Sequence, residues 1–298
     1  MSDAALRGGT PPGVRWRLRG LSRGFPKPSA LPGFGITFGF AITYLSLIVL
    51  IPLAVLVARA ADLGLDGIWR VATTPRVLAA LEVSFFISAA AALVNAVFGT
   101  IVAWVLVRYD FPGKRLLDAA VDLPFALPTA VAGIALAALY ATNGWIGSLF
   151  APFDIKIAFT PLGILVALIF IGLPFVVRTV QPVLQDLDRD VEEASATLGA
   201  TRAQTVLRVV LPALAPALLT GVAMAFARAV GEYGSVIFIA GNMPFVSEIA
   251  PLLIVTRLEE FDYAGAAAIA TIMLALAFVT LLAINALQSF SRRRFGHA

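Results

Sequence analysis

The chain has 298 residues, of which 60% are hydrophobic and 13% are charged, with a formal net charge of +4. Soluble domains carry about 25% charged residues, so this composition excludes an ordinary soluble enzyme, and it is too apolar for a disordered chain. The sequence has no cysteine and one histidine, His297, which excludes disulfides, thiolate metal sites and histidine-based acid–base centres. The composition therefore predicts an integral membrane protein that is not itself an enzyme and binds no metal.

Six apolar stretches are long enough to cross a hydrocarbon core of about 30 Å as helices, so the predicted fold class is all-α with six transmembrane helices. The stretches cover residues 37–58, 83–107, 123–141, 159–177, 213–239 and 264–287. Pro124 and Pro128 interrupt the third stretch and Pro174 lies in the fourth, where they either kink a helix or free backbone groups that line a cavity. The apolar residues 249–255 are too few to span, so we expect a surface or re-entrant segment there, with a seventh span as the alternative.

Lysine and arginine are distributed unequally between the two sides of these stretches. Sixteen lie in residues 1–36, in the second-to-third and fourth-to-fifth connections and in the C-terminal tail, against five on the other side. The positive-inside rule then places both termini in the cytoplasm. A cleaved signal peptide is the alternative for the first stretch, but its apolar core is longer than the usual 7–15 residues or so.

The positions of the apolar stretches and of the basic residues divide the chain into four parts. Residues 1–36 form a basic tail rich in proline and glycine, residues 37–76 the first span and an outer loop, residues 77–288 the main transmembrane domain, and residues 289–298 a second basic tail. Orientation in the membrane accounts for the basic tails, so they do not indicate a nucleic-acid partner.

The connection of residues 185–212 carries helix signals. Asp190 followed by Glu193 resembles a capping box, and the helix that follows would carry Val191, Ala194 and Leu198 on one face. Gly199 stands where a helix ends in a left-handed residue.

A second capping box begins at Thr201 and closes at Gln204, and its helix would run through Leu211 and Pro212 into the fifth span. The residues therefore predict helix, turn, helix outside the membrane. From the residues alone, this unit either packs on its own protein or docks a partner.

The spacing within this connection resembles the EAA motif of ABC importer permeases. The motif residues are Glu193-Ala194-Ser195, then after three residues Gly199, then after nine residues Val209-Val210-Leu211-Pro212. The resemblance implies a type I importer permease whose coupling helix, near residues 190–200, inserts into a groove of a separate ATPase. It also implies that Glu193 faces that groove or braces the helix start, that Leu198 is an apolar anchor and that Gly199 allows the turn. The alternative for Glu193 is a helix cap only.

The chain has no phosphate-binding loop of its own, because that loop needs Gly-Lys followed by Ser or Thr. Of Lys27, Lys114 and Lys156, only Lys114 follows a glycine, and Arg115 comes next. ATP would therefore be hydrolysed by another chain, and no cofactor is expected on this one.

Arg228 and Glu232 lie four residues apart in the fifth apolar stretch and can meet on one helix face. Charges inside a membrane pair with one another or line a polar path, so Arg228 either attracts an anion or holds Glu232 in a structural pair. Gly231 and Gly234 flank the acid and allow a kink or close packing. We take Arg228, Gly231, Glu232, Tyr233 and Gly234 as the candidate translocation path.

A narrower resemblance joins this stretch to the sulfate/thiosulfate branch of ABC permeases. It rests on residues 227–242, 257–263, 269–270 and 285–288. It implies a permease of the bacterial inner membrane that is itself surrounded by lipid. Its partners would be a homologous permease in a heterodimer, two ATPase subunits and an extracytoplasmic sulfate- or thiosulfate-binding protein. The rival interpretations are a molybdate or tungstate importer of the same kind and an ion-coupled secondary anion transporter, for which only Glu232 offers a carboxylate within a span.

The sequence also suggests a role for three polar residues within or beside the predicted spans. Asn95 and Asn285 lie within predicted spans, where amide side chains form hydrogen bonds between helices. Glu248 belongs to a group of outer acids that either meet the binding protein or form a solvated surface.

Overall fold

The computed structural model describes the backbone of residues 34–295 and the side chains of residues 34–286, and this part of the chain is helical without a strand. The basic tail up to residue 33 and the side chains of residues 292–294, which enter the prediction of orientation, lie outside the described residues. The chain divides into two units, Met1–Pro52 and Leu53–Ala298.

The first unit contains α1 (Phe34–Leu45) and the π-helical turn η1 (Ser46–Leu50). The side chains of these two elements are nearly all apolar and exposed, as expected of a helix that faces lipid or another membrane chain. With α2 (Ile51–Ala61), these elements give an apolar run of 28 residues, long enough to cross a membrane. The first predicted span is therefore present as a helix.

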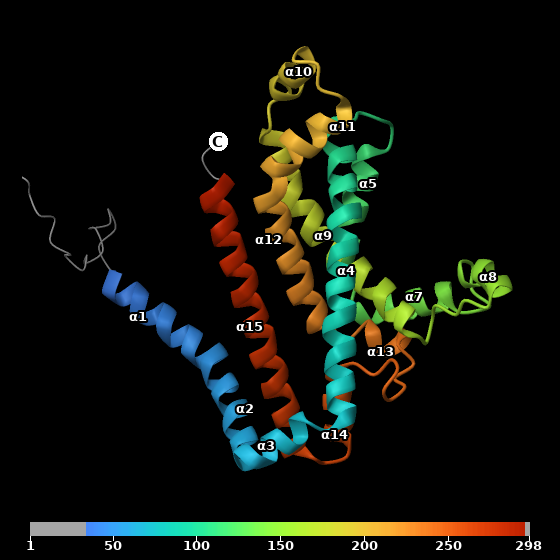
Figure 1. Cartoon of the computed structure of the whole chain (residues 1–298). Coiled ribbons are helices and arrows are strands. Elements are labelled where there is room, and N and C mark those ends of the chain that lie inside the picture. Colours follow the sequence, from blue (N-terminus) through green and yellow to red (C-terminus); the bar gives the residue numbers. More distant parts are fainter. Residues whose placement is uncertain (1–33, 296–298) are drawn as a thin grey trace, which may run out of the picture. The chain divides into compact units, whose positions relative to one another are not determined.

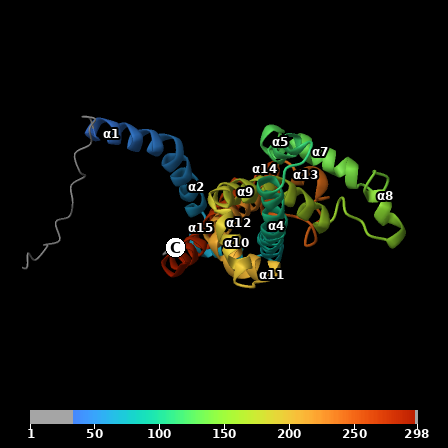
Figure 2. The ribbon, with the colours of Figure 1, turned by 90° about the horizontal axis from the view of Figure 1, so that it is seen from above.

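Three helices form the centre of the second unit. They are α4 (Pro75–Arg108), α9 (Pro161–Asp186) and α12 (Leu211–Val230), which pack along one another (Figures 1 and 2). Their facing side chains, among them the buried Val176 and Leu214, make up the main apolar core. α4 and α9 each begin with a proline in the first helical turn, where its missing N–H costs nothing.

Close approach between α4 and α9 depends on two glycines. A Cβ on Gly99 would lie 2.9 Å from Cβ of Val176, and one on Gly172 would lie 2.5 Å from Nδ2 of Asn95. The space beside Gly172 lets Asn95 donate a 3.1 Å hydrogen bond to the carbonyl of Ile169 on α9. The predicted interhelical role of Asn95 is confirmed.

The remaining predicted polar contact between helices is not confirmed. Asn285 is exposed on α15 (Tyr263–Phe295), and among the described side chains it has no hydrogen bond to another helix. α15 instead contributes an apolar face to α12 and to the short helix α14 (Ala250–Glu259).

α14 corresponds to the short apolar segment predicted as a surface or re-entrant element. Its ten residues reach only about 15 Å, too short to span, so the alternative of a seventh span is wrong. Ala250, Leu252 and Leu253 are buried, so α14 is an internal packing element and not a surface one.

The third predicted span, residues 123–141, is not one continuous helix. The chain breaks between α6 (Leu123–Ala126) and α7 (Thr129–Tyr140), where Leu127 is extended. A residue before proline is sterically driven out of the helical region, so Pro128 causes this break. α7 has 12 residues and reaches only about 18 Å. Three short elements flank this segment: α5 (Lys114–Val121), α8 (Gly147–Phe150) and η2 (Ala151–Phe153).

The fifth predicted span, residues 213–239, is displaced. A continuous helical run of 29 residues starts at Arg202, through α11 (Arg202–Thr205) and η3 (Val206–Val210), and ends at Val230. At Gly231, where a kink or close packing was predicted, α12 ends, and helical structure resumes only as the single turn α13 (Val236–Ile239).

The fourth span matches the prediction but is longer, because α9 stays helical through Pro174 and Pro182. Five helices of the described residues are long and apolar enough to cross a membrane. The prediction of an all-α membrane fold is confirmed, whereas six full spans are not, because the Pro128 break divides the third one.

Candidate functional site

The connection between α9 and α12 forms a separate helical unit at one end of the bundle. Its first helix, α10 (Arg189–Thr197), lies at the top of Figure 1, above α11. The predicted cap at Asp190 is wrong: Asp188 occupies the cap position, and no side-chain hydrogen bond closes it. Asp190 and Glu192 lie in the first turn, where their negative charge is favoured by the helix dipole.

The turn after α10 matches the prediction. Gly199 has a φ of +82°, in the left-handed region that favours glycine, and Ala200 donates to the carbonyl of Ser195 at 3.0 Å. The capping box at the next helix is confirmed, since the Thr201 N–H donates to Gln204 at 2.8 Å and the Gln204 N–H to Thr201 Oγ1 at 3.3 Å. The direction of both helices is therefore set by local hydrogen bonds.

α10 has no buried residue. Val191, Ala194 and Leu198, predicted to share one face, are all exposed, and the side chain of Leu198 is 89% exposed. The hydroxyl of Ser195 donates to the carbonyl of Val191 at 2.8 Å, so this polar side chain is satisfied within the helix. The helix therefore presents a small apolar face that its own chain leaves uncovered.

Glu193 is exposed beside a hollow of about 450 Å³ between the end of α4 and the helix–turn–helix. Trp104 of α4, Tyr109 directly after α4 and Arg202 of α11 also line it. The hollow combines aromatic surface with charges of both signs, which suits a protein side chain or chain segment.

Leu211 and Pro212, the last motif residues, mark the change from π-helix to α-helix. The Leu211 N–H donates to the carbonyl of Val206, five residues back. Pro212 has no N–H to donate, and the wider π-helical turn before it lets the helix continue without that hydrogen bond. The motif thus leads into α12 without interrupting the helix.

Arg108, the last residue of α4, contacts this unit. Its Nη2 lies 2.6 Å from Oε1 of Glu192 on α10 and donates a 3.1 Å hydrogen bond to the carbonyl of Leu187. The guanidinium also lies 5.8 Å from the ring centre of Trp104. One side chain therefore joins the ends of α4 and α9 to α10.

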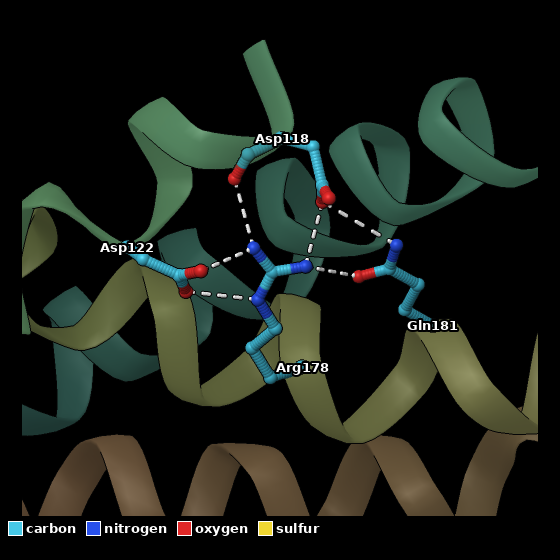
Figure 3. A network of polar contacts seen from close by, with 4 residues as sticks. All are labelled: Asp118, Asp122, Arg178 and Gln181. Atoms are coloured by element: carbon cyan, nitrogen blue, oxygen red, sulfur yellow. Dashed lines mark hydrogen bonds and ion pairs between the residues drawn. The ribbon is translucent and has the colours of Figure 1, made fainter. Parts of the chain in front are cut away.

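A polar network, absent from the sequence-based predictions, holds α5 to α9 (Figure 3). Arg178 of α9 donates to both carboxylate oxygens of Asp122 at 2.6 and 2.9 Å, and to Asp118 at 2.6 Å. It also donates to the amide oxygen of Gln181 at 2.6 Å. Such a two-carboxylate arrangement uses most of the guanidinium donors at once.

The hydrogen bonds from Arg178 hold the pKa of the Asp122 carboxyl below its usual value, although burial acts in the opposite direction. A signal for this network exists in the sequence. Asp118 and Asp122 stand four residues apart, hence on one helix face, and Arg178 interrupts an apolar helix.

The candidate translocation path lies where α12 ends. Arg228 forms an ion pair with Glu232, whose side chain is 2% exposed, as the spacing predicts. Glu232 Oε1 also accepts hydrogen bonds from the N–H and the hydroxyl of Ser235, at 2.9 and 3.0 Å. Tyr233 packs against an apolar cluster, and Gly234 lets the turn approach Thr129 of α7. These contacts give Glu232 a structural role, while a role in anion passage stays a prediction.

Glu248, predicted either to meet the binding protein or to lie on a solvated surface, is buried. Its two oxygens accept hydrogen bonds of 2.7 and 2.8 Å from Arg76 in the first turn of α4. The expectation fails because the partner lies 172 residues away in sequence. No group of three metal-ligating side chains occurs among the described residues.

Residues 95–296 match the family described as "binding-protein-dependent transport system inner membrane component". The sulfate transport system permease protein CysT of Synechocystis sp. is 55% identical over 252 residues, covering 85% of this chain and 88% of the relative. The protein of the same name from Escherichia coli K12 is 52% identical over 268 residues, covering 90% of this chain and 97% of the relative. The predicted resemblance is confirmed.

Two solved structures share the fold. A bacterial ABC transporter involved in the import of the acidic polysaccharide alginate contains a chain with a TM-score of 0.70 at 15% identity, covering 86% of this chain and 94% of that one. A bacterial alginate ABC transporter in complex with a periplasmic protein gives a TM-score of 0.69 at 16% identity, with 87% and 93% coverage. At these identities the likeness concerns the fold, and it confirms the predicted importer-permease architecture.

Proposed function

The chain belongs to the family of binding-protein-dependent transport system inner membrane components, and from this premise we propose that it is a permease subunit of an ATP-driven sulfate or thiosulfate importer. The observation that carries the proposal is 52–55% identity, over most of the chain, to permease proteins of sulfate transport systems. The subunit forms the translocation path with a homologous permease, receives its anion from an extracytoplasmic binding protein and hydrolyses no ATP itself.

α10 is the coupling helix in this proposal and inserts into a groove of a separate ATPase subunit. Support comes from its exposed apolar face, from Leu198 at its end and from the fixed turn at Gly199. The hollow beside Glu193 receives part of the ATPase surface. The α10 end is then cytoplasmic, with both termini on the same side, as the unequal distribution of lysine and arginine indicates.

Sulfate is a dianion that resists loss of its water shell, so a tight site within an apolar bundle is costly. We therefore place selectivity in the binding protein and assign the permease a gated polar cavity, along which Arg228 supplies positive charge. Arg228 is about one-third exposed, so its guanidinium remains accessible although Glu232 pairs with it.

The cargo is tested by uptake of labelled sulfate in a strain that lacks this gene, with and without the gene restored. We expect restored uptake that excess thiosulfate blocks and excess molybdate leaves nearly unchanged. Loss of molybdate accumulation in the deletion strain, with normal sulfate uptake, would transfer the proposal to a molybdate or tungstate importer. Uptake that persists without ATP would indicate a secondary transporter.

The coupling role is tested by Glu193→Lys and Gly199→Trp. Both should abolish uptake while the protein still inserts into the membrane, because one reverses the charge beside the hollow and the other strains a turn with positive φ. Thr280→Ala, which lies outside α10 and removes only a hydroxyl bonded to the carbonyl of Leu276, is the control. Normal uptake by both test variants would show that α10 is not the coupling helix.

A further inference from the structure

Arg108 is the side chain that ties α10 to the longest helix of the bundle. α10 follows α9 directly and leads into α11, so the covalent chain connects it to α9 and α12. Arg108 ends α4 and lies 79 residues before Leu187 in sequence. Its contact with Glu192 is therefore a connection to a third helix that the chain itself does not make.

The surroundings of Arg108 favour a fixed geometry. Its side chain is only 10% exposed, between the ring of Trp104 and the carboxylate of Glu192. A guanidinium is planar and presents several donors in fixed directions, so one group holds the Glu192 oxygen and the Leu187 carbonyl together. Its positive charge also suits the last turn of a helix, where backbone carbonyls point outward.

α4 reaches from this contact to the other end of the bundle. Its 34 residues give a length of about 50 Å, and Figure 1 shows α10 and α14 near its opposite ends. At the far end, Arg76 holds Glu248, and the hydroxyl of Ser84 accepts a 2.8 Å hydrogen bond from the N–H of Ala250, the first residue of α14. α4 is thus fastened by polar contacts at both ends.

We propose that Arg108 is a positioning residue that transmits movement of α10 to α4 through Glu192, and through α4 to the α14 end of the bundle. The inference rests on the proposed coupling role of α10. When the ATPase displaces α10, the ion pair makes α4 follow directly, while the hydrogen bond to Leu187 holds α4 at the end of α9. Without Arg108, α10 remains linked to α9 and α12 by the chain, and α4 follows only through its packing against these two helices.

The test uses the complete importer, with both permeases, the ATPase and the binding protein, in liposomes. Labelled sulfate uptake and ATP hydrolysis are measured together for Arg108→Gln, Glu192→Gln and the double variant. We expect the sulfate moved per ATP to fall about fivefold or more in each single variant, in the range usual for coupling between sites. The double variant should be no worse than the more affected single one, because both remove the same contact.

Controls separate coupling from assembly. Lys114→Gln removes an ion pair with Asp110 of 2.9 Å, which is more exposed, and should leave both rates unchanged. Co-purification of the ATPase is measured for every variant. If Arg108→Gln fails to assemble, Arg108→Lys, which keeps the charge but not the fork, takes its place. An unchanged ratio of sulfate to ATP, or additive losses in the double variant, would overturn the inference.

One further variant distinguishes failure of this inference from failure of the proposed function. The chain has no cysteine, so Leu198→Cys introduces a single thiol on the exposed end of α10. Cross-linking of this thiol to the ATPase, together with an unchanged ratio in Arg108→Gln, would leave the coupling helix in place and reject Arg108. Absence of cross-linking in otherwise wild-type protein would contradict the docking of α10 itself.

Discussion

Two short helices at opposite ends of the bundle, α10 and α14, have almost the same length but opposite surroundings. α14 buries Ala250, Leu252 and Leu253 against the rest of the unit, whereas α10 buries none of its residues. α10 is held instead by its turn, by the Thr201 capping box and by Arg108. A helix that gains nothing from internal burial needs either a partner or local contacts to stay formed.

The apolar side chains of α14 are mostly buried or half-buried within the protein, whereas those of α10 remain available to a partner. Substitutions in α14 should act on stability, because its side chains lie in the core. Substitutions on the exposed face of α10 should act on function, because the isolated subunit loses little when they change. The same type of substitution in the two helices can therefore separate folding from coupling.

The largest expected contrast is between Leu253→Ala and Leu198→Ala. Leu253 is fully buried, so its truncation should lower the free energy of unfolding by about 2–5 kcal/mol. Leu198→Ala should change stability by less than about 0.5 kcal/mol and yet lower sulfate uptake, since only a partner covers this side chain. Thermal unfolding in detergent and uptake in cells measure the two effects. Equal destabilisation by both substitutions would contradict the contrast.

The next effect concerns the ion pair before α14. Glu248→Gln removes the charge that Arg76 pairs with, and we expect a loss of about 2 kcal/mol, smaller than for a fully buried pair because Arg76 keeps some contact with solvent. Glu259→Gln, at the exposed last residue of α14, is the matched control and should be nearly neutral. If the two variants unfold at the same temperature, Glu248 does not stabilise this end.

Local patterns in the sequence were sufficient for several features. Apolar length predicted the long helices, because a span needs about 20 apolar residues regardless of its neighbours. Gly199 and the Thr201–Gln204 box were predicted correctly because a left-handed turn and a capping box depend on residues within one turn. The cap was predicted two positions too late, at Asp190 instead of Asp188, since several neighbouring acids can occupy a cap position.

The sequence did not show which charged side chains of distant segments pair with one another. The partner of Glu248 is 172 residues away, and Asp118 is 60 residues from Arg178, so no local pattern pairs them. Pro128 was predicted to interrupt the third apolar stretch, and it does, because a proline acts on the residue directly before it. The end of α12 at Val230 was hidden within an apolar stretch, because hydropathy measures composition and not the continuity of a helix. The roles of the candidate path and of the coupling residues stay predictions.

A smaller contrast compares the hydrogen bonds that cap the two ends. Ser84→Ala removes the acceptor for the buried N–H of Ala250 and should cost about 1–2 kcal/mol. Thr201→Ala removes an exposed cap and should cost about 1 kcal/mol or less. Thermal unfolding ranks the two, and Ser84→Cys, which keeps similar size but offers only a weak acceptor, checks that the lost acceptor is responsible. A larger loss from Thr201→Ala than from Ser84→Ala would reverse the expected order.

The smallest effect is the dependence of stability on pH near the α10 end, where α5 is fastened by charge. Arg178 lowers the pKa of Asp122 in the folded protein below its unfolded value of about 4, so the stabilisation is complete above that value and is lost as the pH falls through the folded pKa.

Because Asp122 is about half exposed, Asp122→Asn should cost less than about 1 kcal/mol at pH 7. The difference between the unfolding midpoints of wild type and variant, measured from pH 7 to pH 3, should then begin to shrink below about pH 4, since protonated Asp122 and asparagine both lack the charge that Arg178 pairs with. Asp154→Asn, at an exposed carboxylate between η2 and α9, should give no such convergence. A constant difference between wild type and Asp122→Asn down to pH 3 would show that the Asp122 charge does not hold α5 to α9.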